Sequence, residues 1–418
     1  MALPRRTLYA VFAIAGAASF LLCGYEFIRA VSTSLFIDAY GSRNLPWVMA
    51  AVPPGVYLII YTYGRFLSWW GANRALAATS LLSAGLMVGA YGLLVRGYPF
   101  ASAIIYVFRE AYIVLIIEQY WSFVNSTLNP EQARSINGPF CGIASLGSIA
   151  GGSLVKYLAE PLGSETLLLL AAASLIPAAV CSVIAYTLAG EPQPSPVEMG
   201  GGQGHTGMRV LFKSRYLVFI LMLILATQVV STVLDLQFNG LVEESIPDKD
   251  ARTAFYGGFY GQWLGISAAV LQFIGVPILL RLFPLRFIHL GIPMIHFVAC
   301  GVLTVSPSLG TGAAAFLLFK AFDYSIFRAG KEMFYIPLSF DARYRAKQVI
   351  DSLGYRSAKG ASALTIALIG LAASTGSGTI PGMAFSLTAM GMAVIWSGIA
   401  SKLTTQYQQL TETKHPDA

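Results

Sequence analysis

Charged side chains inside long apolar stretches are the residues of this sequence that could do chemistry. Five are basic and six are acidic: Arg29, Arg109, Lys320, Arg328 and Lys331, with Glu26, Glu110, Glu118, Asp235, Asp323 and Glu332. Ionisable groups within a membrane span are costly and usually functional. Because the two signs nearly balance, they favour a substrate that carries both signs, the exchange of one anion for another, or an acid that titrates during a cycle.

Spacing brings several of these charges onto shared helix faces. Glu26 and Arg29 are three residues apart, and Arg328 and Glu332 are four apart, so each pair can form an ion pair along one helix. Such pairs could simply lock helices together. Bundles pack with small residues alone, however, so the whole set favours a water-filled cavity that binds a charged solute.

One stretch carries two lysines on the same predicted face. Lys320 and Lys331 are eleven residues apart, which is close to three turns of an α-helix, so we expect them to project in one direction. Lys320 is also three residues from Asp323. A helix that presents two ammonium groups to a polar interior is a candidate anion-binding element.

The elements that must position these charges are membrane-spanning helices. The 418-residue chain is 56% hydrophobic and 11% charged, whereas soluble proteins carry about 25% charged residues. A span needs about 20 apolar residues. The sequence predicts an all-α polytopic membrane protein with about twelve spans, at 8–31, 45–63, 75–95, 100–124, 138–158, 163–188, 215–238, 254–280, 286–306, 312–337, 358–375 and 379–400.

The longest polar connection divides the chain into two halves. Residues 189–214 are rich in Pro, Gly and Ser, a composition typical of a flexible linker. We therefore expect a six-helix half at 1–188, a cytoplasmic linker at 189–214, a second six-helix half at 215–403 and a polar tail at 404–418.

With the N-terminus inside, the cytoplasmic loops and tails hold 17 of the 27 Lys and Arg residues and the other side holds 5. This bias predicts cytoplasmic termini and a multi-pass protein of a bacterial inner membrane.

Other classes of function lack their motifs. Cys23, Cys141, Cys181 and Cys300 have no CxxC spacing, and the four histidines are scattered, so we expect no metal and no cofactor. Neither a protease or hydrolase motif nor a phosphate-cradling glycine loop is present, which argues against an enzyme and against ATP-driven pumping. No Lys/Arg-rich run is interleaved with aromatics, so we expect no nucleic-acid partner. The expected partners are the lipid bilayer and a small polar or anionic solute, bound by a monomer.

One continuous stretch resembles a known family. Residues 331–360, KEMFYIPLSFDARYRAKQVIDSLGYRSAKG, are similar to a signature of the ATP/ADP antiporters of plastids and intracellular bacteria. The shared features are the run from Lys331 to Leu338, then Lys347, Ile350-Asp351 and Gly354 with Arg356. Weaker resemblance runs through both halves. The resemblance implies a twelve-helix fold of the major facilitator kind that works by alternating access.

The resemblance also implies site residues. Lys331 matches a substrate-site lysine of the family, Glu110 matches a site glutamate, and Asp235 stands where the family has glutamate. The second-helix lysine of the family falls at Met49, a departure that replaces an ammonium by a thioether.

The sequence therefore predicts a secondary active transporter that exchanges nucleotides or other organic phosphates or anions. We expect substrate contacts from Lys331, Glu110, Asp235, Lys320 and Arg109. Roles in coupling or gating are expected for Glu26, Arg29, Glu118, Asp323, Arg328 and Glu332. Met49 and the balanced charges leave one alternative open: a proton-coupled carrier of an amphiphile, lipid or peptide-like solute on the same fold.

Overall fold

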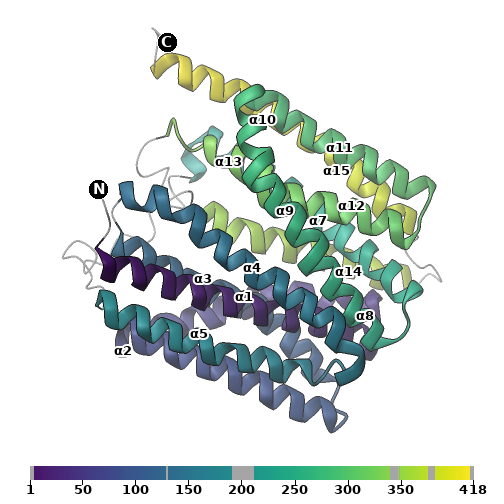
Figure 1. Ribbon diagram of the computed structural model, residues 1–418. Helices are drawn as coiled ribbons and strands as arrows, with labels where there is room; N and C mark the ends of the chain where they lie inside the picture. The colour runs from purple at the N-terminus through teal and green to yellow at the C-terminus, as the bar shows by residue number, and fades with distance from the viewer. Residues whose placement is uncertain are drawn as a thin grey trace. The chain divides into compact units, whose positions relative to one another are not determined.

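The computed structural model describes residues 4–128, 130–190, 211–338, 347, 349–374 and 382–414, and the regular structure in these ranges is helical throughout (Figure 1). The long helices are α1 (Arg5–Tyr40), α2 (Leu45–Val95), α3 (Phe100–Thr127), α4 (Pro130–Leu162), α5 (Leu167–Ala189), α7 (Arg215–Ser245), α11 (Leu285–Val305), α14 (Tyr355–Ser374) and α15 (Gly382–Lys414). Shorter segments are α8 (Lys249–Gly257), α9 (Gly265–Val270), α10 (Val276–Leu282), α12 (Leu309–Phe322) and α13 (Arg328–Met333).

The predicted polytopic all-α fold is confirmed. Within the described ranges, nine helical segments are long and apolar enough to cross a membrane. The other three expected spans, 138–158, 312–337 and 358–375, also fall largely on helical residues. The count of twelve crossings therefore stays a prediction.

Two of the expected spans are joined end to end in α2. The helix breaks at Gly71, whose φ of 76° and ψ of 175° are not helical. A positive φ is strained for residues that carry a Cβ atom, so a glycine suits this position. The break lies between the expected spans 45–63 and 75–95.

The chain forms two compact units, and the first is centred on α1. It comprises Met1–Gly41, Ala51–Ser195 and Ile246–Ile266. Within it, α1 packs against α3, α4, α5 and α8. Helix α4 approaches α1 closely, because a Cβ atom on Gly147 would lie 1.9 Å from the carbonyl oxygen of Ser19 and one on Gly151 would lie 2.4 Å from that of Cys23. Glycine therefore allows α4 to contact the backbone of α1.

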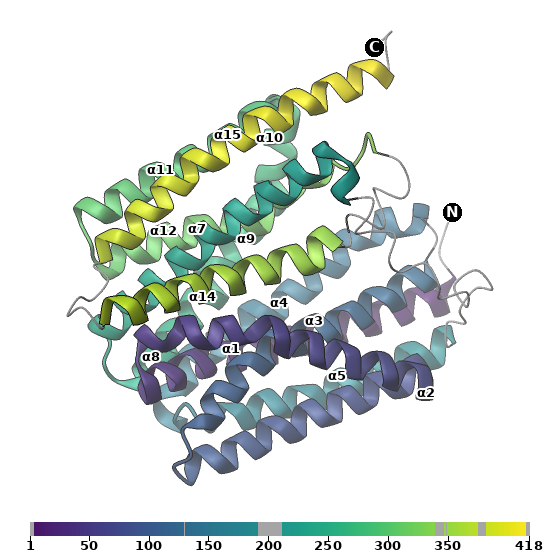
Figure 2. The same ribbon diagram turned by 180° about the vertical axis from the view of Figure 1, so that it is seen from behind.

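The second unit comprises Ser42–Ala50, Pro196–Ser245 and Ser267–Ala418. Helix α7 packs against α12, α14 and α15, and α11 packs against α12 and α15 (Figure 2). These boundaries follow contacts rather than chain order, since the residues around α8 belong to the first unit. The domain limits expected from the linker remain a prediction.

Several helices contain π-helical turns. They lie at Gly258–Leu264, Leu271–Gly275, Asp323–Phe327 and Val349–Gly354. A π turn adds a residue to the helical repeat and is frequent at functional sites. Three of these segments, Gly258–Leu264, Asp323–Phe327 and Val349–Gly354, contain or contact the charged residues described below.

Candidate functional site

Arg109 is buried between α3 and α1 in the first unit. Its side chain is 7% exposed, and its Nη1 atom lies 2.8 Å from both the carbonyl oxygen of Arg29 and the hydroxyl of Ser32. The same nitrogen donates to the hydroxyl of Thr33, and the guanidinium carbon lies 3.9 Å from the centre of the Tyr106 ring. Neutral acceptors on α1 thus hold Arg109, so its first effect is to fix the position of that helix.

Glu26 and Arg29 form the predicted ion pair in α1. Arg29 Nη1 lies 3.9 Å from Glu26 Oε1, which also accepts a 2.6 Å hydrogen bond from Ser148 of α4. Glu26 Oε2 is buried and has no hydrogen-bond partner within the part of the chain that the structure describes. The guanidinium carbon of Arg29 lies 3.6 Å from the ring centre of Tyr260, in the π-helical segment Gly258–Leu264. Sequence spacing predicted the pair but gave no signal for Ser148 or Tyr260.

Helix α3 carries two of the predicted acids, Glu110 and Glu118. Glu110 is partly exposed, at 31% of its side chain, and its Oε1 atom lies 3.3 Å from Nε of Arg109. Glu118 lies on α3, but its side chain is outside the described residues. Arg29, Arg109, Glu26 and Glu110 therefore form the charged cluster of the first unit.

Lys331 is the centre of a charged cluster in the second unit. Its side chain is 5% exposed, and its Nζ atom lies 2.6 Å from Oδ1 of Asp351 and 3.6 Å from Oε1 of Glu332. Glu332 also accepts a 2.5 Å hydrogen bond from Lys347. Asp351 lies in the π-helical segment Val349–Gly354, and the signature in the sequence contains it without indicating that it is the partner of Lys331. Asp351, Lys331, Glu332 and Lys347 thus form a row in which carboxylates and ammonium groups alternate.

Asp235 has a partner that sequence reasoning missed. Its Oδ2 atom lies 3.1 Å from Nζ of Lys359, near the start of α14. Its Oδ1 atom accepts a 2.9 Å hydrogen bond from Asn239, one turn further along α7. The pair connects α7 to α14 in the second unit. Lys359 is the fifth residue of α14, and a long side chain near the start of a helix can reach a neighbouring helix. This position was the only feature of the sequence that indicated a contact between Lys359 and another helix.

Lys320 has a different environment from Lys331. It is 8% exposed, and its Nζ atom donates a 3.0 Å hydrogen bond to the hydroxyl of Ser231 on α7. The ring centres of Phe316, Phe319 and Tyr324 lie 5.6, 5.7 and 5.8 Å from this nitrogen. No ion pair to Lys320 is present among the described residues. A buried ammonium that faces a hydroxyl and aromatic rings can accept an anion.

The stretch between the two lysines is not a continuous α-helix. Residues Asp323–Phe327 form a π turn, so the eleven-residue spacing no longer places Lys320 and Lys331 on one face by the 3.6-residue repeat. Arg328 is exposed, and within the described ranges Glu332 pairs with Lys331 and Lys347 rather than with Arg328. The shared face therefore rested on an α-helical geometry that this stretch does not keep. Arg328 and Glu332 both lie in α13, but there the carboxylate of Glu332 is taken by the two lysines.

The basic side chains of these clusters can exchange one anionic partner for another. Ammonium and guanidinium groups bind carboxylate and phosphate oxygens through the same charge-assisted hydrogen bonds. A phosphate can therefore replace a carboxylate as the partner of a lysine, and the ammonium group stays paired. Among the described residues, no group of three His, Cys, Asp or Glu side chains could hold a metal ion.

Comparison with known proteins agrees with the family resemblance. Residues 285–407 match the model of the TLC ATP/ADP transporter family. The chain is 23% identical over 380 residues to an ADP,ATP carrier protein 1 of Chlamydia trachomatis, an alignment that covers 81% of this chain and 70% of that protein. It is 28% identical over 179 residues to an ADP,ATP carrier protein 1 of Rickettsia prowazekii, covering 38% and 35% of the two chains.

Solved structures with the same fold are transporters. A bacterial homologue of the iron transporter ferroportin, in an inward-facing state, aligns with a TM-score of 0.68 and 14% identity over 97% of this chain and 100% of that one. A D-xylose–proton symporter aligns with a TM-score of 0.62 and 12% identity over 92% and 96%. At these identities the likeness shows the fold alone.

The predicted resemblance to the ATP/ADP antiporters is thus confirmed, at low sequence identity. The chain has a major facilitator-like fold with several apolar helices, as expected of an integral multi-pass membrane protein. The family that it resembles consists of transporters and not of enzymes.

Proposed function

We propose that this protein is a secondary active transporter that exchanges nucleotides or other organic phosphates across the membrane by alternating access. The observation that carries the proposal is the environment of Lys331. This buried lysine lies in the segment that matches the transporter family, and its ammonium is held 2.6 Å from a carboxylate that a phosphate oxygen could replace.

The ion pairs supply a physical basis for obligatory exchange. When no substrate is bound, Lys331 pairs with Asp351 and Lys359 pairs with Asp235, so each buried charge is compensated. A bound phosphate replaces Asp351 and Asp235 as the partner of the lysines, and the two carboxylates are released. Because an uncompensated buried charge is costly, the return step without substrate requires that the internal pairs form again.

The first unit contributes a second cationic cluster to the proposal. Arg29 has 14% of its side chain exposed, and Arg109 holds α1 in position through its hydrogen bond to the carbonyl oxygen of Arg29. Glu110, at 31% exposure, is the acid of this cluster that a substrate amine or a coupling ion can reach. We propose that the protein acts as a monomer in a bacterial inner membrane, with both termini in the cytoplasm.

Met49 favours one alternative function. Its side chain is buried, at 2% exposure, where the ATP/ADP antiporters have a lysine. A site with one cation fewer binds a highly charged anion less well. A proton-coupled carrier of an amphiphile, lipid or peptide-like solute is the function that this position favours.

Uptake by proteoliposomes tests both proposals. Vesicles that contain ADP should take up labelled ATP or another organic phosphate from a panel, and empty vesicles should not. A thermal-shift screen of the purified protein against nucleotides, phosphorylated metabolites and lipids provides an independent measurement, since a ligand that binds the native state raises its unfolding temperature. Stabilisation by lipids or peptides alone would contradict phosphate exchange and favour the alternative.

A further inference from the structure

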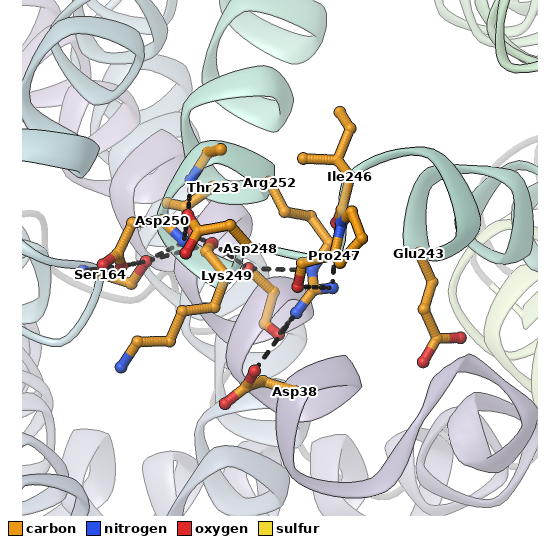
Figure 3. Close-up of polar contacts among 12 residues, drawn as sticks. Asp38, Ser164, Glu243, Ile246, Pro247, Asp248, Lys249, Asp250, Arg252 and Thr253 are labelled. Carbon is orange, nitrogen blue, oxygen red and sulfur yellow. Dashed lines mark hydrogen bonds and ion pairs between the residues drawn. The ribbon is translucent and has the colours of Figure 1, made fainter.

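Arg252, near the start of α8, is a buried cation outside the clusters described above. It is 2% exposed, and its guanidinium donates to the hydroxyl of Ser34 at 3.2 Å and to the carbonyl oxygens of Ser34, Ile246 and Pro247 at 3.1, 3.3 and 3.4 Å (Figure 3). The carboxylate of Asp38 lies 3.8 Å away, and half of its side chain is exposed. Arg252 thus binds the last turns of α1, and all these contacts lie within the first unit.

A second group of polar contacts joins the same segment to the turn between α4 and α5. The backbone nitrogen and hydroxyl of Ser164 donate to Oδ1 of Asp250 at 2.8 and 2.6 Å. The hydroxyls of Ser164 and Thr253 are 2.7 Å apart, and Lys249 forms an ion pair with Glu165. Figure 3 shows Ser164 beside Asp250 and Thr253. Each partner in this group is a hydroxyl, a carboxylate, an ammonium or a backbone amide.

Further along, the segment contacts α4 and α1 through glycine and one tyrosine. A Cβ atom on Gly152 would lie 2.3 Å from Cα of Gly261, so the two backbones touch. One residue earlier, Tyr260 covers the guanidinium of Arg29 at 3.6 Å. Docking of residues 249–264 therefore places an aromatic ring over a cation of the candidate site.

The composition of this contact surface suits repeated opening. Hydrogen bonds to hydroxyls and carbonyls can be exchanged for hydrogen bonds to water at a small net cost. Glycine faces have no side chains that interlock, so they separate without rotamer changes. The chain beyond this segment continues from Ser267 into the second unit, so a movement of that part of the helix would pull directly on the docked residues.

We propose that residues 249–264 form a releasable lid on the first unit, with Arg252 as its latch and Tyr260 as the group that covers Arg29. The proposal rests on the transport function proposed above, because opening uncovers Arg29 once in each cycle. Arg252 is accordingly a positioning residue. It acts on the candidate site through the segment that carries Tyr260.

Cross-linking tests whether the lid must open. In a background with Cys23, Cys141, Cys181 and Cys300 replaced by alanine, Ser164→Cys and Thr253→Cys would place two sulfurs where hydroxyls are now 2.7 Å apart. Oxidation should abolish ATP uptake into ADP-loaded proteoliposomes, and a reductant should restore it. Undiminished uptake by the quantitatively cross-linked protein would overturn the proposal.

Labelling in detergent tests the latch without any substrate. The reporter is a single Thr253→Cys in the same background, a position that is 0% exposed. Arg252→Gln should raise its rate of modification by a charged thiol reagent about tenfold or more, as expected for the loss of hydrogen bonds to a charged group. Gly152→Ala should do the same by forcing the backbones apart. The matched control is Gly142→Ala on the same helix, where an added Cβ meets nothing within 4 Å and the rate should not change.

The two experiments separate failure of the lid from failure of the proposed function. If ATP and ADP are not exchanged at all, the labelling rates still report on the latch, because they are measured without substrate. Equal rates in the parent, Arg252→Gln and Gly152→Ala proteins would overturn the proposal even if transport is normal.

Discussion

The Nζ atom of Lys359 lies 3.1 Å from Oδ2 of Asp235, which connects α14 to α7 through a pair of charges that is largely shielded from water. Asp235 is 12% and Lys359 is 28% exposed at the side chain. Removing one member of such a pair leaves the other uncompensated, whereas removing both does not. The interaction between Asp235 and Lys359 can therefore be tested by comparing single variants with the double variant.

Asp235→Asn and Lys359→Met should each lower the unfolding temperature of the purified protein, and the double variant should recover much of the loss. We expect a coupling energy of about 1–3 kcal/mol, as is usual for residues in direct contact. Unfolding of the single and double variants, monitored by intrinsic fluorescence, measures this coupling energy. Additive losses would show that the two side chains do not depend on each other.

Lys331→Ala should abolish transport while the protein still folds. The lysine is held by Asp351 and Glu332, and its loss removes the ammonium that we expect to bind phosphate. Truncating one partner of a buried charge pair costs about 2–5 kcal/mol in binding, so uptake of labelled ATP should fall at least about 30-fold. Far-UV circular dichroism and expression level are the controls. Near-normal uptake would remove Lys331 from the site.

Much of the fold could be predicted from the sequence, because long apolar runs report directly on membrane-spanning helices. Within the described ranges, the expected spans fall largely on helical residues. Ion pairs within a regular helix were also predictable, as for Glu26 and Arg29.

Partners from distant helices and from π turns could not be predicted in the same way. The contact of Lys359 with Asp235 joins positions 124 residues apart, and no pattern in a single sequence reports such a distance. The π turn at Asp323–Phe327 alters the repeat on which the Lys320–Lys331 argument depended. No spacing pattern predicts the burial of Arg252 or its bonds to Ser34, because both are properties of the folded first unit.

Arg109→Lys should destabilise the protein by loosening α1. The guanidinium reaches the carbonyl of Arg29 and the hydroxyls of Ser32 and Thr33, and a lysine cannot reproduce this forked geometry. We expect the unfolding temperature to fall by a few degrees, with a rise in KM for ATP that exceeds the change in kcat. A fall in kcat alone, with unaltered stability, would contradict a positioning role.

The distribution of basic residues predicts the orientation in the membrane. Single cysteines at Gly202, which lies outside the described residues, and at Lys249 should react with an impermeant thiol reagent from opposite sides of the bilayer. Only the residue 249 variant should be labelled in intact cells, and residue 202 should become reactive after permeabilisation. Labelling of residue 202 from outside would reverse the orientation.

Exchange and proton coupling differ in what drives uptake. In an exchanger, Glu110 and Asp235 stay ionised and alternate between pairing with cations and yielding them to substrate. In a proton-coupled carrier, one of them binds and releases a proton in each cycle.

We expect exchange, because both carboxylates lie next to cations in the folded protein: Glu110 at 3.3 Å from Arg109 and Asp235 at 3.1 Å from Lys359. A phosphate group that binds the cation can release each carboxylate, so the cycle that we propose is completed by substrate on either side of the membrane. Uptake of labelled ATP should therefore require ADP inside the vesicles and should not respond to an imposed pH gradient. If protons were coupled instead, Glu110→Gln or Asp235→Asn would remove the response to the gradient and spare exchange. Robust uptake into empty vesicles, driven by a pH gradient alone, would replace the exchange mechanism with the proton-coupled one.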